Sequence, residues 1–335
     1  MYPSNDTKEI NPRPIFVVGM NGSGTTMLID CLGRHPELYA FPRETRLLPH
    51  ILNKYANSES LKDDDVFLNA WNEVRAIPVF REINAGHLPP LPKEWQKQPR
   101  TIGNVIDTIF RFFGEKENKS RWCEKTPQHV QHIKLLASHY PEARFIHLIR
   151  DGRDCAASFH RRWKRNPYLC VYRWKKVVSE GRDQGQTIGD RYMEVKFEDL
   201  TSNPKTWMNM ICIFVGVTFD SSVLTSRRPQ SKEKGSMGSI EPQKTRWKEY
   251  FGNETLRKIE SIAGKELGGH GYEVNHNAGD NDPSPALLLY WRAYDYVMQF
   301  TQEFFGKLTG SSKKSWLRVL QQPHIAIKQF VRNKY

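Results

Sequence analysis

Runs of apolar residues along the chain predict three buried strands and several helices. Residues 15–18 are all apolar and mostly β-branched, which is typical of a strand buried in a parallel sheet. A second buried strand is predicted at 143–150, which reads ARFIHLIR, and a third candidate strand covers 191–200. Helical spacing of apolar residues appears at 25–33 and at 102–113. Strands that alternate with helices predict an α/β fold, in which helices cover both faces of a central parallel sheet.

The same pattern predicts one main domain with an addition at each end. Residues 1–13 are expected to form a flexible lead, and residues 14–280 the main domain, a three-layer sandwich. Within that domain, residues 55–120 are expected to form a helical cap over the site, with one helix that ends at Gly114. Residues 281–335 are predicted to form a C-terminal helical extension that is first aromatic and then basic.

The charge balance narrows the choice of partner. The 335 residues carry a formal net charge of +13, so an anionic ligand or surface is expected. Residues 306–335 hold seven Lys or Arg and no acid. The five cysteines form no CxxC pair, which disfavours both a zinc site and a disulfide framework. The polar first residues and the lack of an 18-residue apolar run predict a cytoplasmic protein.

A glycine-rich segment joins the first strand to the first helix. It reads GMNGSGTT, from Gly19 to Thr26, and would point backbone N–H groups and a helix dipole at an anion. A Walker A loop has Lys where this chain has Thr25, so a nucleoside triphosphate would be held poorly. A nucleotide with only a short 5′ anion would not need that lysine. The alternative is a glycine-rich turn without a ligand. The candidate ligand-binding residues are Asn21, Gly22, Ser23, Gly24, Thr25 and Thr26.

A second stretch, IRDGRDCAASFHRRW, suits another phosphate group. Arg150 stands at the end of the second strand, and Ser158 lies two helical turns further on. Arg162 is one turn beyond Ser158, on the same helix face. Two guanidinium groups and a hydroxyl can bind a phosphate together. The alternative is an ordinary basic helix with surface ion pairs.

Together, the two stretches resemble the sulfotransferases that use 3′-phosphoadenosine 5′-phosphosulfate (PAPS), in particular the tyrosylprotein branch and its bacterial relatives. The resemblance covers roughly residues 14–50, 121–163 and 191–273. It implies a P-loop-like fold whose first loop holds the 5′-phosphosulfate, while Arg150, Ser158 and Arg162 hold the 3′-phosphate and adenosine side. It also implies PAPS as donor co-substrate, adenosine 3′,5′-bisphosphate as product, and no metal.

The resemblance further assigns roles near the reacting group. In "ETR", Glu44 would be the general base and Arg46 would lie beside the acceptor, and in "CEKTP" Lys125 would aid sulfuryl transfer. A segment that closes over the donor would contribute Ser231 and Arg246. The chain departs from the family at Gly22, where Arg or Lys is usual, at His50, where the tyrosylprotein branch has Arg, and at Phe197, where Tyr is usual. Arg46 or Lys125 is therefore expected to supply the charge missing at Gly22, and His50 is a candidate acceptor contact.

The resulting hypothesis is an O-sulfotransferase that acts by in-line displacement. Its acceptor hydroxyl could belong to a tyrosine in an acidic peptide, a glycan or a lipid-linked compound. A P-loop kinase is disfavoured by Thr25, and a catalytically weak nucleotide-binding protein of the same fold stays open. A nucleic-acid partner is not expected, because no recognition module occurs.

The C-terminal helical extension allows two interpretations. Its aromatic residues could form core or a homodimer face, or the helix and the basic end could rest on anionic lipid, which would place the protein at the inner membrane. The residues concerned are Leu287, Tyr290, Trp291, Tyr294 and Val297.

Overall fold

The computed structural model divides the chain into two compact units. The described residues run from 13 to 308 apart from these gaps: 84–86, 227–237, 241–244 and 277. The first unit comprises residues 1–149 and 180–243, and the second comprises residues 150–179 and 244–335.

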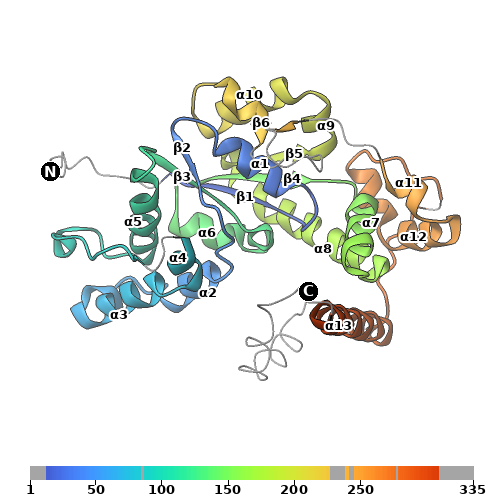
Figure 1. Ribbon diagram of the computed structural model, residues 1–335, viewed down its shortest axis with the longest axis horizontal. Helices are drawn as coiled ribbons and strands as arrows, with labels where there is room; N and C mark the ends of the chain where they lie inside the picture. Colours follow the sequence, from blue (N-terminus) through green and yellow to red (C-terminus); the bar gives the residue numbers. More distant parts are fainter. Residues whose placement is uncertain (1–12, 84–86, 227–237, 241–244, 277, 309–335) are drawn as a thin grey trace. The chain divides into compact units, whose positions relative to one another are not determined.

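The first unit is built on a five-stranded parallel sheet with the strand order β2-β3-β1-β4-β5 (Figure 1). The strands are β1 Ile15–Gly19, β2 Leu38–Ala40, β3 Arg121–Lys125, β4 Arg144–Ile149 and β5 Tyr192–Lys196. The register aligns Val17 with Lys125 and Gly19 with Leu148. Because the strands are parallel, the segments that follow β1, β2 and β3 leave the sheet at the same edge, where ligands bind in α/β folds.

Helices cover both faces of this sheet. The helices that lie wholly in this unit are α1 Thr25–Leu32, α2 Leu48–Lys54, α3 Asp64–Arg75, α4 Pro78–Ile83, α5 Ile102–Glu115, α6 Ile133–His139, α9 Phe197–Ser202 and α10 Pro204–Val215. A short antiparallel pair, β6 Thr225–Ser226 and β7 Gly238–Ser239, completes the described part of the unit. On one face, Leu28 and Ile211 pack against Val17 and Leu148 in a solvent-free aliphatic core. Alternation along each strand sends the neighbouring side chains to the opposite face.

That opposite face carries an aromatic core. The Phe16 ring stacks on Phe145 with centroids 5.1 Å apart and meets the edge of Trp122 at 5.6 Å. Phe110 from α5 stacks on Trp122 at 4.2 Å, so α5 is fixed to β3. The indole N–H of Trp122 donates to the buried carboxylate of Asp107, 2.7 Å away. The sheet is therefore the middle layer of three.

The second unit is helical in its described part. It contains α7 Gly152–Trp163, the first part of α8 Pro167–Gln186, α11 Trp247–Tyr250, α12 Asn253–Gly269 and α13 Pro285–Leu308. A Cβ on Gly152 would lie 2.6 Å from the Trp174 ring, so only glycine fits at the start of α7. The indole of Trp174 donates to the carbonyl of Arg150 at 2.8 Å. Among the described residues, no helix has the length and apolar character that crossing a membrane requires.

The predicted parallel α/β fold is confirmed, with corrections to single elements. The predicted strand at 191–200 is wrong beyond Lys196, because Phe197–Ser202 form α9, whose first turn carries two acids that favour a helix start. Gly114 does not end its helix, which continues to Glu115. A Cβ on Gly114 would lie only 3.3 Å from Tyr39, so this glycine permits close packing inside the helix.

The C-terminal helix residues that were expected to form core or a dimer face differ in burial. Trp291 is buried, whereas Tyr290 and Val297 are more than half exposed. Residues 309–335, the basic part of that extension, lie outside the described residues. The proposed lead and cap boundaries stay predictions.

Candidate functional site

The phosphate loop follows β1 and leads into the N-terminus of α1. Gly19, Gly22 and Gly24 have φ angles of +149°, +92° and +99°, a region that favours glycine. A Cβ at Gly24 would lie 2.5 Å from the Phe197 ring, so that side of the loop is sealed by packing. Ser23 is fully buried, and its hydroxyl has no hydrogen-bond partner among the described residues. A bound phosphate group would satisfy that hydroxyl, so the loop fits an anion.

The remaining loop residues supply hydroxyl and amide groups rather than charge. Thr25 is buried, and Asn21 and Thr26 are partly exposed at the start of α1. The first N–H groups of a helix lack intrahelical acceptors, and the helix dipole favours an anion beside them. Any full positive charge at this loop must therefore come from a neighbouring segment.

Lys125 and Glu44 supply a charged pair at the same edge of the sheet. Lys125 ends β3, which lies next to β1, and Glu44 follows shortly after β2 on the other side of β3. Lys125 Nζ lies 2.8 Å from Glu44 Oε1. Arg46 binds the other carboxylate oxygen, with Nη2 at 2.6 Å and Nε at 2.9 Å from Oε2. The structure thus brings together three residues that the sequence places up to about eighty positions apart.

The two cations keep Glu44 ionised. Burial alone would raise the pKa of Glu44, but hydrogen bonds from Lys125 and Arg46 and their charges hold the pKa below its usual value. A carboxylate in this state can accept a proton but is a weak base while both partners stay in place. Loss of either cation would raise the pKa of Glu44 and strengthen it as a base.

A buried polar network fixes the segments that carry this pair. Glu124 is fully buried, and its Oε1 accepts from the Thr45 amide at 3.2 Å, the Thr45 hydroxyl at 2.9 Å and the Thr126 hydroxyl at 2.5 Å. Its Oε2 lies 3.0 Å from Nδ1 of the buried His129. Thr45 directly follows Glu44, and Thr126 directly follows Lys125. The carboxylate of Glu124 therefore ties together the two backbones from which the charged pair projects.

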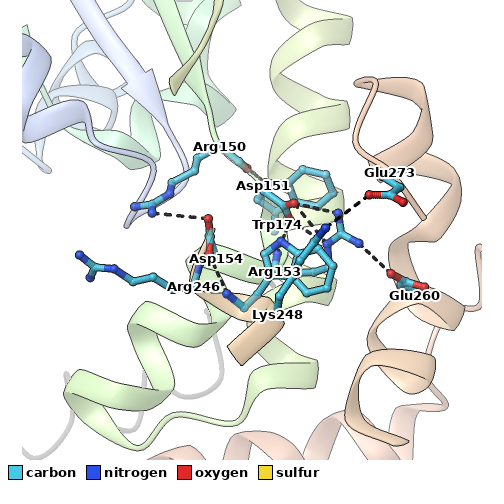
Figure 2. A network of polar contacts seen from close by, with 10 residues as sticks. Arg150, Asp151, Arg153, Asp154, Trp174, Arg246, Lys248, Glu260 and Glu273 are labelled. Atoms are coloured by element: carbon cyan, nitrogen blue, oxygen red, sulfur yellow. Dashed lines mark hydrogen bonds and ion pairs between the residues drawn. The ribbon is translucent and has the colours of Figure 1, made fainter. Parts of the chain in front are cut away.

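The second unit gathers cations around one buried acid (Figure 2). Arg150 Nη2 lies 3.6 Å from Asp154 Oδ2, and the backbone N–H of Arg246 donates to Asp154 Oδ1 at 2.9 Å. Partial burial lowers the pKa of the Arg162 guanidinium, and the like charges of Arg161, Arg246 and Arg150 lower it further. Arg150, Arg162 and Arg246 thus share a positive field, which suits a phosphate group.

A buried arginine anchors this cationic cluster. Arg153 donates to Asp151 at 2.8 Å and to Glu260 of α12 at 2.7 Å, and its guanidinium lies 3.8 Å from the centre of the Trp247 ring (Figure 2 draws the ion pairs). Burial alone would lower the pKa of Arg153, but the two carboxylates raise it. The Trp247 amide donates to Asp154 at 3.0 Å, which fixes Arg246 next to α7.

The other predicted site residues are less closely defined. Ser158 is partly buried on α7, and His50 is exposed on α2. Ser231 lies outside the described residues.

Burial raises the pKa of Cys31, Cys123 and Cys170 to about 12, so these thiols are poor nucleophiles. Within the described ranges, no group of three or more His, Cys, Asp or Glu could hold a metal ion.

A parallel α/β sheet with a glycine-rich loop between its first strand and first helix defines a P-loop-like α/β fold. The chain belongs to the sulfotransferase family, whose sequence profile matches residues 14–221. The family resemblance found in the sequence is thereby confirmed.

Individual relatives are distant. A protein-tyrosine sulfotransferase A of Caenorhabditis elegans is 26% identical over 63% of this chain and 51% of its own length. An omega-hydroxy-beta-dihydromenaquinone-9 sulfotransferase of Mycobacterium bovis is 26% identical over 61% of this chain and 63% of its own. The sulfotransferase domain of a Synechococcus olefin synthase is 24% identical and has a TM-score of 0.47 over 78% of this chain and 98% of that domain. The matched part of the chain thus spans about half of the tyrosine sulfotransferase.

Sequence reasoning missed the residues that support the site. Thr45, Glu124, Thr126 and His129 make the buried network, and Asp154 organises the second-unit cations. Glu124 follows the two apolar residues Trp122 and Cys123 within β3, which is only a weak sequence signal for a buried acid. The hydrogen-bond partners of Glu124 are harder to predict from the sequence, since Thr45 lies 79 positions away.

Proposed function

We propose that this protein is an O-sulfotransferase that transfers the sulfuryl group of PAPS to an acceptor hydroxyl. The observation that carries the proposal is the contact of Glu44 with Lys125 at the edge of the sheet where β1 enters the phosphate loop. In-line transfer needs a base for the acceptor proton and a cation for the charge that develops on the leaving oxygen. Glu44 and Lys125 have these two properties.

Donor binding is assigned to two groups of residues. Residues 21–26 would surround the 5′-phosphosulfate with N–H groups and hydroxyls, including the buried hydroxyl of Ser23. Arg150, Ser158 and Arg162 are assigned to the 3′-phosphate, and Arg246 and Ser231 to the segment that closes over the donor. The shared positive field of the three arginines supports this assignment.

The donor supplies an activated sulfuryl group whose bond to the bridging oxygen breaks as the acceptor oxygen bonds to sulfur. Glu44 takes the acceptor proton, while Lys125, Thr25, Thr26 and the loop N–H groups stabilise the negative oxygen that leaves with adenosine 3′,5′-bisphosphate. Lys125 cannot pair fully with the Glu44 carboxylate and with the leaving oxygen at the same time. As Lys125 turns toward the oxygen, the pKa of Glu44 rises and the base becomes stronger.

The acceptor is proposed to be a tyrosine or a lipid-linked hydroxyl, with a glycan as a third class. The names of two relatives, a tyrosine sulfotransferase and a menaquinone sulfotransferase, support the first two classes. Arg46 is largely exposed beside Glu44 and, together with His50, would contact the acceptor. An exposed guanidinium beside the base suits an acceptor that carries negative charge. A cytoplasmic location at the inner membrane is part of this proposal.

Two measurements test the proposal. Calorimetry should show binding of adenosine 3′,5′-bisphosphate, loss of that binding in Arg150→Ala, and much weaker binding of ATP. With labelled PAPS and an acceptor panel, Lys125→Ala should lower kcat about 100- to 1,000-fold, the usual cost of one group that stabilises a developing oxyanion. Lys97→Ala removes an exposed lysine that pairs with the exposed Glu94 one helical turn away, and should leave kcat unchanged.

The outcomes separate the alternatives. Preferential binding of ATP would favour a P-loop kinase. Tight bisphosphate binding without transfer to any acceptor would favour a catalytically weak nucleotide-binding protein, as Gly22 in the loop allows. A further test uses Arg46→Ala, which should move the acidic limb of kcat/KM to higher pH, because Glu44 loses a hydrogen bond that lowers its pKa. An unchanged limb would remove Glu44 from the role of base.

A further inference from the structure

Helix α13 has one side that is fixed within the second unit. Trp291 is buried, with its ring centre 5.7 Å from that of Tyr168 and 6.0 Å from the amino group of Lys258. On the same side, the carboxylate of Asp295 accepts the backbone N–H of Asn166 at 2.6 Å. The orientation of the helix about its own axis is therefore set.

The opposite side of α13 is apolar and exposed. Its large residues are between 56% and 63% exposed: Leu289, Tyr290, Tyr296, Val297 and Phe300. At 3.6 residues per turn, these positions fall with Ala286 and Ala293 in one arc of about 120°, and between residues 286 and 300 that arc contains no charged residue. A helix on a protein surface ordinarily turns its polar side outward, and a large exposed apolar patch marks an interaction site. We call this arc the α13 face.

The sequence that follows the α13 face identifies the kind of partner. Residues 306–335 carry seven Lys or Arg and no Asp or Glu. A second copy of the chain would add seven further cations in its own residues 306–335, and the like charges of the two copies would repel. An anionic membrane surface offers the complement: an apolar boundary zone for the aromatic residues and negative headgroups for the basic segment.

We propose that the α13 face and the basic residues after it dock the protein on an anionic phospholipid surface. The tyrosines and the phenylalanine suit the boundary between headgroups and acyl chains, where aromatic side chains concentrate. The basic residues add attraction that depends on anionic lipid and weakens with salt. This proposal does not depend on the sulfotransferase assignment, since it predicts binding rather than turnover.

Vesicle co-sedimentation of the full chain tests the proposal. We expect binding to vesicles of phosphatidylcholine with phosphatidylglycerol and little binding to phosphatidylcholine alone. The double variant Leu289→Glu, Val297→Glu should lose binding. The matched control, Met210→Glu with Ile213→Glu, makes the same charge change at two exposed apolar residues of α10 and should keep it.

A second variant keeps the test valid if the first one fails to fold. Replacing Lys313, Lys314 and Arg318 by glutamine should weaken binding by about fivefold for each charge removed, roughly a hundredfold in total. Failure of the wild type to sediment with either vesicle overturns the proposal, as does equal loss of binding in the α10 control. Sedimentation equilibrium covers the second-copy alternative: a dimer that Leu289→Glu, Val297→Glu dissociates, without vesicle binding, would also overturn it.

Discussion

Replacing the buried Glu124 with leucine tests whether its carboxylate holds the neighbouring Glu44–Lys125 pair in place. Burial alone would raise the pKa of Glu124, but His129 and hydrogen bonds from Thr126 and Thr45 hold the pKa below its usual value. The group is therefore ionised at neutral pH. Leucine is close in size to glutamate but accepts none of these hydrogen bonds.

The contacts of Glu124 set the expected loss of unfolding free energy. Removing one partner from a buried, hydrogen-bonded charge network costs about 3–5 kcal/mol of unfolding free energy. The Thr45 amide keeps a second acceptor, the Thr126 hydroxyl at 2.9 Å, so we expect the lower end of that range. Glu124→Gln keeps one carbonyl oxygen for the threonines and offers an amide donor to Nδ1 of His129 in the tautomer protonated on Nε2. That conservative variant should cost only about 1–2 kcal/mol.

Urea unfolding at pH 7 measures both variants, and steady-state kinetics shows whether the pair has moved. If Glu124 positions Glu44 and Lys125, its leucine variant lowers kcat, while glutamine restores much of it. The stability that ionised Glu124 gives the wild type is fully present above the ordinary glutamate pKa of 4.5. It is lost as pH falls through the lowered pKa of Glu124 in the folded state. A leucine variant that unfolds at the wild-type urea midpoint, or equal losses from both substitutions, would refute the reasoning.

Two further substitutions have opposite expected signs. Gly24→Ala should cost about 1–3 kcal/mol and weaken bisphosphate binding, because its Cβ would lie 2.5 Å from the Phe197 ring at a positive φ. Gly268→Ala, with open space around its Cβ in α12, should instead stabilise by about 0.5–1 kcal/mol. A raised urea midpoint for Gly24→Ala would contradict the first argument, and a lowered midpoint for Gly268→Ala would contradict the second. Burial raises the pKa of Asp107, so its contribution to stability falls as pH rises above the ordinary 3.8. Asp107→Asn keeps an acceptor for the Trp122 indole and should flatten that pH dependence; an unchanged slope in thermal unfolding would count against it.

The sequence predicts those parts of the fold and site that local patterns specify. The apolar run before Gly19, the glycines and the helical spacing after them define a strand, a loop and a helix within about twenty residues. Arg150 is recognisable for the same reason, because it ends an apolar strand. Strand β3 was not predicted, since its five residues include three charged ones, at Arg121, Glu124 and Lys125. The burial of Glu124 in this strand depends on its hydrogen bond with Thr45, 79 positions away, and no local sequence pattern contains that contact.

Helix α13 shows a different limit of periodicity. Apolar residues occur all around it, so spacing alone does not identify the inner side, whereas the structure buries Trp291 and exposes Tyr290. The informative residue is Asp295, an acid that lies on the buried side because it accepts the amide of Asn166. Once a buried acid identifies the inner side, the charge-free arc must face outward. With Asp295 turned inward and Tyr290, Tyr296 and Phe300 turned outward, α13 has the polarity that suits an apolar environment, and this reversal is why we propose a lipid surface as the partner of the α13 face.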